Sequence, residues 1–304
     1  VKKIGQAGIE SIRIYIIDLH GRLRGKEFPI GEFEEAYKKG IFFGPIFTLT
    51  LNGEGIPTPY GPGSSPMGDM KAKPIPSSFR RIPWEPTAGL IISELYATDG
   101  ENIGLDPLFT LRRQYEEALR MGYLLQAASE LEFYIYRLDE GRPTPYPHVL
   151  GRLKSPYDAE RLDESSTVLT KIESAAKAFE LDICTRLVEY SAGQYEINFR
   201  HTDVLRNAEN TILFKYAAKE VARRSGCYAS FMPKPSTNEV GNSLHLHLNL
   251  VDPKTGENLF HNPDGKYGLS DLAYYFAGGL LSHAKALTAI MCPTVNSYKR
   301  LKPY

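Results

Sequence analysis

The chain has 304 residues, 42% of them hydrophobic and 24% charged, which suits one large domain or two ordinary ones. Lysine plus arginine and aspartate plus glutamate balance at 36 each, which argues against a dedicated surface for nucleic acid or anionic membrane. The three cysteines lack Cys-x-x-Cys spacing, and no apolar run has transmembrane length or a signal-peptide layout. We expect a cytoplasmic protein whose partners are small molecules rather than nucleic acid or membrane.

The first hundred residues predict a small β-rich domain. Its apolar residues alternate, and prolines and glycines crowd its middle. The expected elements are a hairpin over 11–30 with its turn at His20-Gly21, a helix over 31–40, a long proline-rich loop arm over 44–86 and a strand over 89–95.

The rest of the chain predicts alternating helices and strands. Helix starts are marked by capping residues at Asp106, Asp203 and Ser270. The expected elements are helices from 107 to Gly122, around 165–180, from Asp203 to Gly226 and from Ser270 towards Met291, with strands over 129–136, 189–200 and 242–250. We therefore expect an α/β or α+β domain over 101–304.

Three segments of this second domain place polar side chains on one face and apolar ones on the other. Alternate residues of a strand lie on opposite faces of a sheet, so the polar residues of each segment share a side. A further acid, Glu189, precedes a turn of small residues at 191–193. The polar faces carry Glu130 and Glu132 on the first strand, Glu196, Asn198 and Arg200 on the second, and His245, His247 and Asn249 on the third.

Such faces have two interpretations. On any single strand, alternation most often marks a sheet with one face in water, and a lone histidine is more often structural than a ligand. Several glutamates and a histidine facing one space would instead bring like charges together, and these stay ionised only when a cation joins them. Oxygen-rich sets with one imidazole favour Mg²⁺ or Mn²⁺ over Zn²⁺, and such ions serve phosphoryl transfer from ATP.

Phosphate-binding glycine loops and hydrolase motifs are missing from the sequence. It holds no Walker loop, no G-x-G-x-x-G opening a helix and no G-x-S-x-G elbow. ATP would therefore bind through metal ions, arginine and aromatic residues.

Four motifs of the second domain together resemble the glutamine synthetase family. They are SELEF at 129–133, EYSAGQYEIN at 189–198, FMPKP with GNSLHLHL over 231–248, and NSYKRL at 296–301, while DLHGRLRGKEFP at 18–29 and FRRIPWEP at 79–86 resemble its N-terminal domain. The resemblance implies an α+β chain: a β-grasp-like domain over 1–100, then an open antiparallel β-barrel catalytic domain with outer helices over 101–304.

The resemblance also implies an activity in nitrogen metabolism, the ATP-dependent ligation that makes glutamine or a related amide. ATP phosphorylates the γ-carboxylate of glutamate, and ammonia or an amine then attacks the γ-glutamyl phosphate. The implied metal ligands for Mg²⁺ or Mn²⁺ are Glu132, Glu189 and Glu196 at one ion and Glu130 and His245 at a second. The implied ATP contacts are His247 and Phe199, and the residues implied to bind the acid substrate are Gly241 and Arg300. The implied catalytic residues are Glu189 and Arg300.

Two departures from the family's pattern concern the substrates. Ammonia-using members carry an Asp-Gly-Ser-Ser loop in the N-terminal domain, whereas residues 40–53 here read GIFFGPIFTLTLNG and offer no such acid. Deprotonating ammonium needs a carboxylate, so a polyamine or alkylamine is an alternative acceptor. Val240 stands where the family has asparagine, which weakens the assignment of plain glutamate as the acid.

A third departure is the end of the sequence, directly after NSYKRL. Family members continue through a flap and an Asn-Arg-rich segment with phosphate-binding arginines and a further ligand glutamate. We expect either a polypeptide that continues beyond Tyr304 or a shortened form, and the latter leaves an inactive scaffold or regulator as an alternative function. The resemblance also implies a homo-oligomer of stacked six-membered rings.

Overall fold

A computed structural model describes residues 8–50, 53–55, 68–147 and 155–301. Residues 51–52 and 56–67 of the expected proline-rich arm, and the last three residues of the chain, lie outside this part. The chain divides into two compact units, residues 1–116 and 117–304. Among the described residues, no helix combines the length and apolarity needed to cross a membrane.

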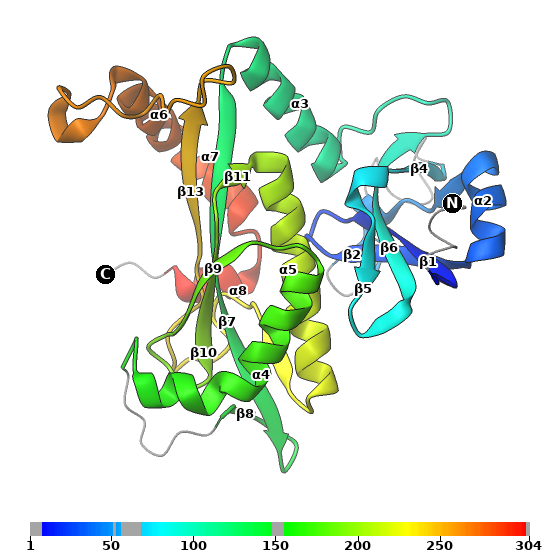
Figure 1. The fold of residues 1–304 in the computed structure, drawn as a ribbon, viewed down its shortest axis with the longest axis horizontal. Coiled ribbons are helices and arrows are strands. Elements are labelled where there is room, and N and C mark those ends of the chain that lie inside the picture. The colour runs from blue at the N-terminus through cyan, green and yellow to red at the C-terminus, as the bar shows by residue number, and fades with distance from the viewer. Residues whose placement is uncertain (1–7, 51–52, 56–67, 148–154, 302–304) are drawn as a thin grey trace. The chain divides into compact units, whose positions relative to one another are not determined.

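The first unit is built on one mixed sheet (Figure 1). The hairpin predicted over 11–30 is confirmed, since β1 pairs antiparallel with β2, and β1 also pairs parallel with β6. Alternate side chains of β1, such as Ile12 and Ile14, are fully buried under helix α2 and its Phe33. The elements are β1 (Ser11–Ile17), β2 (Leu23–Pro29), α2 (Ile30–Lys39), β3 (Ile41–Phe43), η1 (Ile46–Thr48), β4 (Met70–Pro74), η2 (Pro76–Ser78), β5 (Arg80–Ile82), β6 (Glu85–Ala97) and α3 (Pro107–Arg120).

The second unit is organised around one long strand, β7 (Leu124–Asp139). Its two edges are each shared by shorter antiparallel strands placed end to end. One edge pairs with β13 (Leu244–Val251) and β12 (Tyr228–Ser230), and the other with β11 (Thr202–Asp203), β10 (Gln194–Phe199) and β8 (Arg142–Pro145); β9 (Ile183–Val188) lies outside β10. All the strands predicted for this half are therefore present, with β7 as their common neighbour.

Two long helices cover the apolar side of this sheet (Figure 1). Helix α4 (Ala159–Ala178) begins at Asp158 and α5 (Val204–Arg224) at Asp203, and each cap carboxylate accepts a hydrogen bond from a first-turn amide. Phe214 of α5 packs edge-on against Phe133 of β7 and Phe199 of β10. The apolar halves of the alternating strands therefore form the core, and the polar halves lie on the other face.

The helix predicted from Ser270 towards Met291 is two helices. Ser270 caps α6 (Asp271–Ser282) as expected, but the chain breaks at His283 before α7 (Ala284–Met291). A short 3-10 turn, η3 (Lys266–Gly268), precedes them, and α8 (Val295–Arg300) follows. The apolar side chains Leu244 and Leu246 of β13 are 45% and 42% exposed, so this side of the strand has little cover from the described residues.

Gly193 closes the turn between β9 and β10, and its conformation requires glycine. Its φ is +69°, and a Cβ atom there would lie 2.8 Å from the carbonyl oxygen of Ile135. Gly226 has nearly the same φ, +71°, with nothing within 4 Å of the same position.

We expect Gly193→Ala to destabilise the protein more than Gly226→Ala does. The left-handed conformation costs an alanine about 1–2 kcal/mol at either position, and overpacking against backbone adds about 1–3 kcal/mol at Gly193 alone. Urea unfolding of the two variants measures the difference in the free energy of unfolding. Equal losses would contradict the close approach of this turn to β7.

Candidate active site

Strand register gathers the polar side chains predicted from the sequence. Glu132 of β7 lies directly opposite Glu196 of β10, while Glu130 lies between Asn198 of β10 and His245 of β13. Directly opposed residues have Cβ atoms about 4.5–5.5 Å apart, so these side chains meet on one face. The prediction that three strands present acids and histidine to a common space is therefore confirmed for these residues.

Two groups of three side chains could each hold a metal ion. Glu130, Glu196 and His245 form one, and Glu132, Glu189 and Glu196 form the other, with ligand atoms within 4.8 Å of one another in each group. Glu196 belongs to both. The donors are carboxylate oxygens and one imidazole, a set that suits Mg²⁺ or Mn²⁺. The residues present therefore fit two neighbouring divalent ions.

Glu196 is the most deeply placed of these acids, with only 7% of the residue exposed. Burial raises the pKa of its carboxyl group, and the charges of Glu130 and Glu132 raise it further, against a lowering contact from Asn198. A raised pKa means that the ionised form costs more free energy here than in water, and a bound cation would offset that cost.

Glu189 reaches the same space from the turn after β9. Its backbone amide donates to the carbonyl oxygen of Gln194, 2.9 Å away across the turn. This bond holds Glu189 beside the first residue of β10. Burial raises the pKa of Glu189, followed by the charges of Glu132 and Glu196. Two of the acids in the second group, Glu189 and Glu196, thus have raised pKa values.

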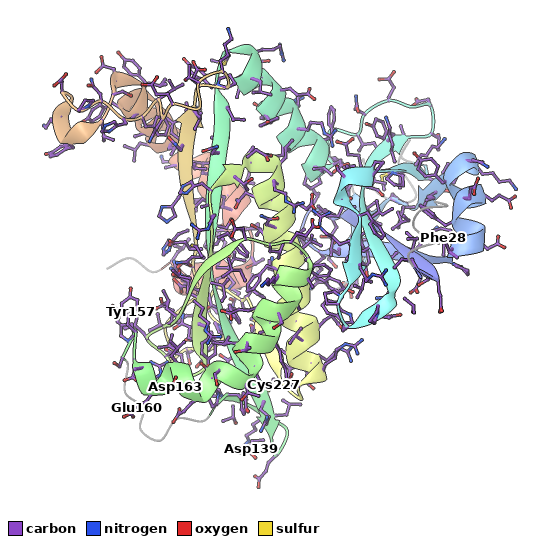
Figure 2. All side chains as sticks on the ribbon, viewed as in Figure 1. Phe28, Asp139, Tyr157, Glu160, Asp163 and Cys227 are labelled. Carbon is purple, nitrogen blue, oxygen red and sulfur yellow. The ribbon has the colours of Figure 1, made fainter. Side chains whose placement is uncertain are left out.

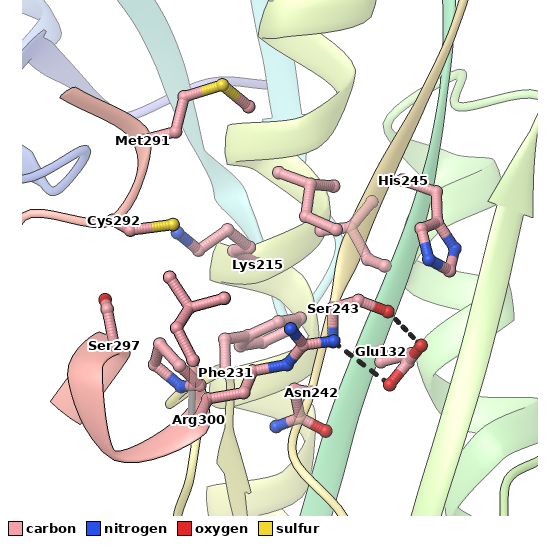
Figure 3. Close-up of a pocket in the computed structure, with 14 residues that line it drawn as sticks. Glu132, Lys215, Phe231, Asn242, Ser243, His245, Met291, Cys292, Ser297 and Arg300 are labelled. Carbon is pink, nitrogen blue, oxygen red and sulfur yellow. Dashed lines mark hydrogen bonds between the residues drawn. The ribbon is translucent and has the colours of Figure 1, made fainter. Parts of the chain in front are cut away.

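Glu132 is held by neutral donors that the sequence interpretation missed. The Ser243 amide donates to its Oε2 atom at 3.0 Å, the Ser243 hydroxyl donates to Oε1, and Figure 3 shows both bonds. The buried Gln194 amide also donates to Glu132 and reaches Gly241 and Asn242, each at 3.2 Å. Gln194 stands next to the turn in EYSAGQYEIN, so its position could have suggested this role.

Glu130 lies between two histidines. Its carboxylate oxygens are 3.3 Å from His245 Nδ1 and 3.0 Å from His247 Nε2. The imidazole of His245 can therefore turn either to Glu130 or to a shared ion, and His247 can fix the orientation of Glu130.

Arg300 and Gly241, the predicted acid-substrate residues, meet beside a pocket of about 480 Å³. A Cβ atom at Gly241 would lie 2.9 Å from Arg300 Cγ, so the arginine stem packs on the glycine backbone. Glu132 and Lys215 also line this pocket (Figure 3). Burial, followed by the charge of Lys219, lowers the pKa of Lys215. A lysine within the buried face of α5 was the sequence signal for this residue, and it was missed.

His247 lines a second pocket, of about 450 Å³, on the other side of Glu130. The ring of His201 stands edge-on to that of His247, with centroids 6.2 Å apart, and Arg200 and Cys184 are also among the lining residues. Phe199 borders the pocket too, but it is only 3% exposed and its ring packs against Phe214. The exposed ring beside His247 is therefore that of His201, which the alternation in NFRH did not single out.

Comparison with known proteins gives a family match over this unit. The family model described as "Glutamine synthetase, catalytic domain" matches residues 104–304. A glutamine synthetase of Pyrococcus horikoshii is 37% identical over 295 residues, which are 97% of this chain and 62% of that protein. One of Methanosarcina mazei is 34% identical over 307 residues, covering 100% of this chain and 65% of that protein. The chain thus spans less than two thirds of these relatives.

Solved structures agree with the sequence relatives. One titled "GmaS/ADP complex-Conformation 1" superimposes with a TM-score of 0.86 at 31% identity, over 99% of this chain and 66% of that one. A "novel glutamine synthase homolog" gives a TM-score of 0.84 at 28% identity, over 97% and 68%. The glutamine-synthetase-like fold expected from the motifs is therefore confirmed.

The metal-free protein should become more stable as the pH falls from 7 to 5.5. The folded pKa values of Glu189 and Glu196 lie above their unfolded values, so the folded state takes up protons first and the repulsion is relieved. We expect the melting temperature in EDTA to rise by about 2–4 °C for each kcal/mol gained.

Glu196→Gln provides the comparison for this prediction. This substitution removes the shared charge, so it should raise the melting temperature at pH 7. The further rise in melting temperature between pH 7 and pH 5.5 should then be smaller than in the wild type. The exposed Glu257→Gln changes the net charge equally and should do neither. If the melting temperature of Glu196→Gln changed with pH as much as that of the wild type, this would contradict the proximity of these acids.

Proposed function

The chain belongs to the glutamine synthetase family, and from that premise we propose that it carries the metal and substrate sites of an ATP-dependent carbon–nitrogen ligase. The proposed reaction joins an amine to the γ-carboxylate of glutamate through a γ-glutamyl phosphate. The observation that carries the proposal is the pair of three-ligand groups that share Glu196. Assembly into a homo-oligomer of stacked rings is part of the same proposal.

In this proposal, Glu132, Glu189 and Glu196 hold one divalent ion, and Glu130, Glu196 and His245 hold the other. Mg²⁺ or Mn²⁺ there would neutralise charge that develops on phosphate oxygens during transfer. The raised pKa values of Glu189 and Glu196 support this, since a cation offsets the cost of their ionised forms. Gln194 and Ser243 orient Glu132 through neutral hydrogen bonds.

In this proposal, one pocket binds the amino acid and the other binds ATP. Arg300, whose stem packs on Gly241, binds the carboxylate of the amino acid as a planar donor fork. Lys215 adds a second positive charge to that pocket. ATP lies on the other side of Glu130, with its base against the exposed ring of His201 and with His247 beside it. Phe199 supports this surface from the core rather than stacking on the base.

The acceptor is ammonia or a larger amine, and the expected outcome of an assay separates them. Phosphate release from ATP with glutamate and Mg²⁺ should depend on an added amine, and Glu196→Gln should reduce it by at least about 100-fold through loss of a shared ligand. His201→Ala should raise the KM for ATP by about tenfold, the effect of one lost stacking contact.

Each result has a defined meaning. Full turnover with ammonium alone excludes the version restricted to bulky amines. Methylammonium and a diamine test the alternative acceptors. Phosphate release that is absent under every condition, or unchanged in Glu196→Gln, would contradict the ligase proposal and favour a scaffold.

A further inference from the structure

A pocket of about 810 Å³ lies farther along β7, away from the carboxylates. Its lining comes from the end of β7, from β8 and from β12 with the segment that follows it; Figure 2 labels Asp139 at the end of β7 and Cys227 just before β12. None of the proposed metal or substrate residues lines it. Its lining residues are Tyr136, Leu138, Pro143, Tyr228, Ser230, Met232, Pro235, Ser236 and Thr237.

Strand register makes one wall of this pocket aromatic. Tyr228 of β12 lies directly opposite Tyr136 of β7, so both rings stand on the same face of the sheet. The ring of Tyr134 stacks on that of Tyr136, with centroids 5.4 Å apart and planes within 14°. Tyr228 is 52% exposed, so its ring is open to a ligand.

The segment after β12 provides the facing wall. Met232, Pro235, Ser236 and Thr237 belong to it, and together they offer a flexible thioether, a ring and two hydroxyl groups. The hydroxyl of Tyr136 is buried and has no hydrogen-bond partner among the described residues.

One carboxylate, that of Glu239, acts electrostatically on the aromatic wall of this pocket. After burial itself, the cause that raises the pKa of Tyr136 is the charge of Glu239, which acts on Tyr134 as well. The Glu239 carboxylate forms no ion pair within the described ranges. The nearest cation of the segment, Lys234, donates its ammonium group to the backbone carbonyl of Glu239.

We propose that this pocket binds a small organic ammonium ion, of the size of a primary alkylammonium. The ring faces of Tyr136 and Tyr228 attract a cation, and Met232, Leu138 and the prolines accommodate its methylene groups. The charge of Glu239, which acts on both Tyr134 and Tyr136, adds a favourable electrostatic contribution. An anion or an uncharged isostere gains neither of the two electrostatic contributions.

The test is a ligand-observed NMR titration of n-butylammonium into the 304-residue protein without ATP, glutamate or metal. Binding should saturate, and 1-butanol, which keeps the chain but lacks the charge, should bind at least about tenfold more weakly. Because no substrate of the ligase reaction is present, failure here leaves the proposed function standing, and failure of phosphate release leaves this site standing.

Variants separate this pocket from the rest of the surface. Tyr228→Leu should weaken n-butylammonium binding about tenfold, and Tyr228→Phe, which keeps the ring, should retain it. Glu239→Gln should weaken it severalfold, which is the expected loss of one nearby charge. Tyr275→Leu and Glu257→Gln make the same changes at exposed positions elsewhere and should have no effect.

Three outcomes would overturn the proposal. They are no saturable binding, equal binding of 1-butanol, and equal losses in the pocket variants and their matched controls. Thermal melting of each variant checks that it is folded, and the ring-retaining Tyr228→Phe keeps the test decisive if Tyr228→Leu does not fold.

Discussion

The antiparallel register of β7 and β10 places Glu132 opposite Glu196, and the rest of the candidate site depends on that pairing of like charges. A slip of one residue would turn either acid to the apolar face, so register and chemistry are linked. The register is held by the buried side chains on the reverse of both strands, such as Phe133 and Ile197, and by the turn that Gly193 permits.

The acids of the candidate site lie in different environments. Glu132 accepts hydrogen bonds from Gln194 and Ser243, so neutral groups fix its position without cancelling its charge. Glu189 and Glu196 keep raised pKa values, because burial and neighbouring charges disfavour their ionised forms. The side chains of such a site are oriented before a cation binds. Cation binding then offsets the free-energy cost of the ionised, partly buried carboxylates. That property is what a phosphoryl-transfer ligase needs from the chain.

Local patterns in the sequence predicted much of this. Alternation assigned the faces of the strands, and Asp203 and Ser270 marked two helix starts, because these features depend on neighbouring residues. Contacts between distant segments were not predictable. The hydrogen bonds of Gln194 and Ser243 to Glu132 join β10 and the residue before β13 to β7, and the burial of Phe199 follows from α5 packing behind β10. Lys215, in contrast, had a local signal, because it is a lysine within the buried face of α5.

Calorimetric titration of Mn²⁺ into EDTA-stripped protein tests the central claim, that Glu196 is shared between two metal groups. We expect two binding events, both weakened at least about tenfold by Glu196→Gln. Glu189 belongs to one group only, so Glu189→Gln should weaken one of them. Wild-type protein that binds no Mn²⁺, or Glu196→Gln protein that binds it as wild type does, would contradict the shared-ligand arrangement.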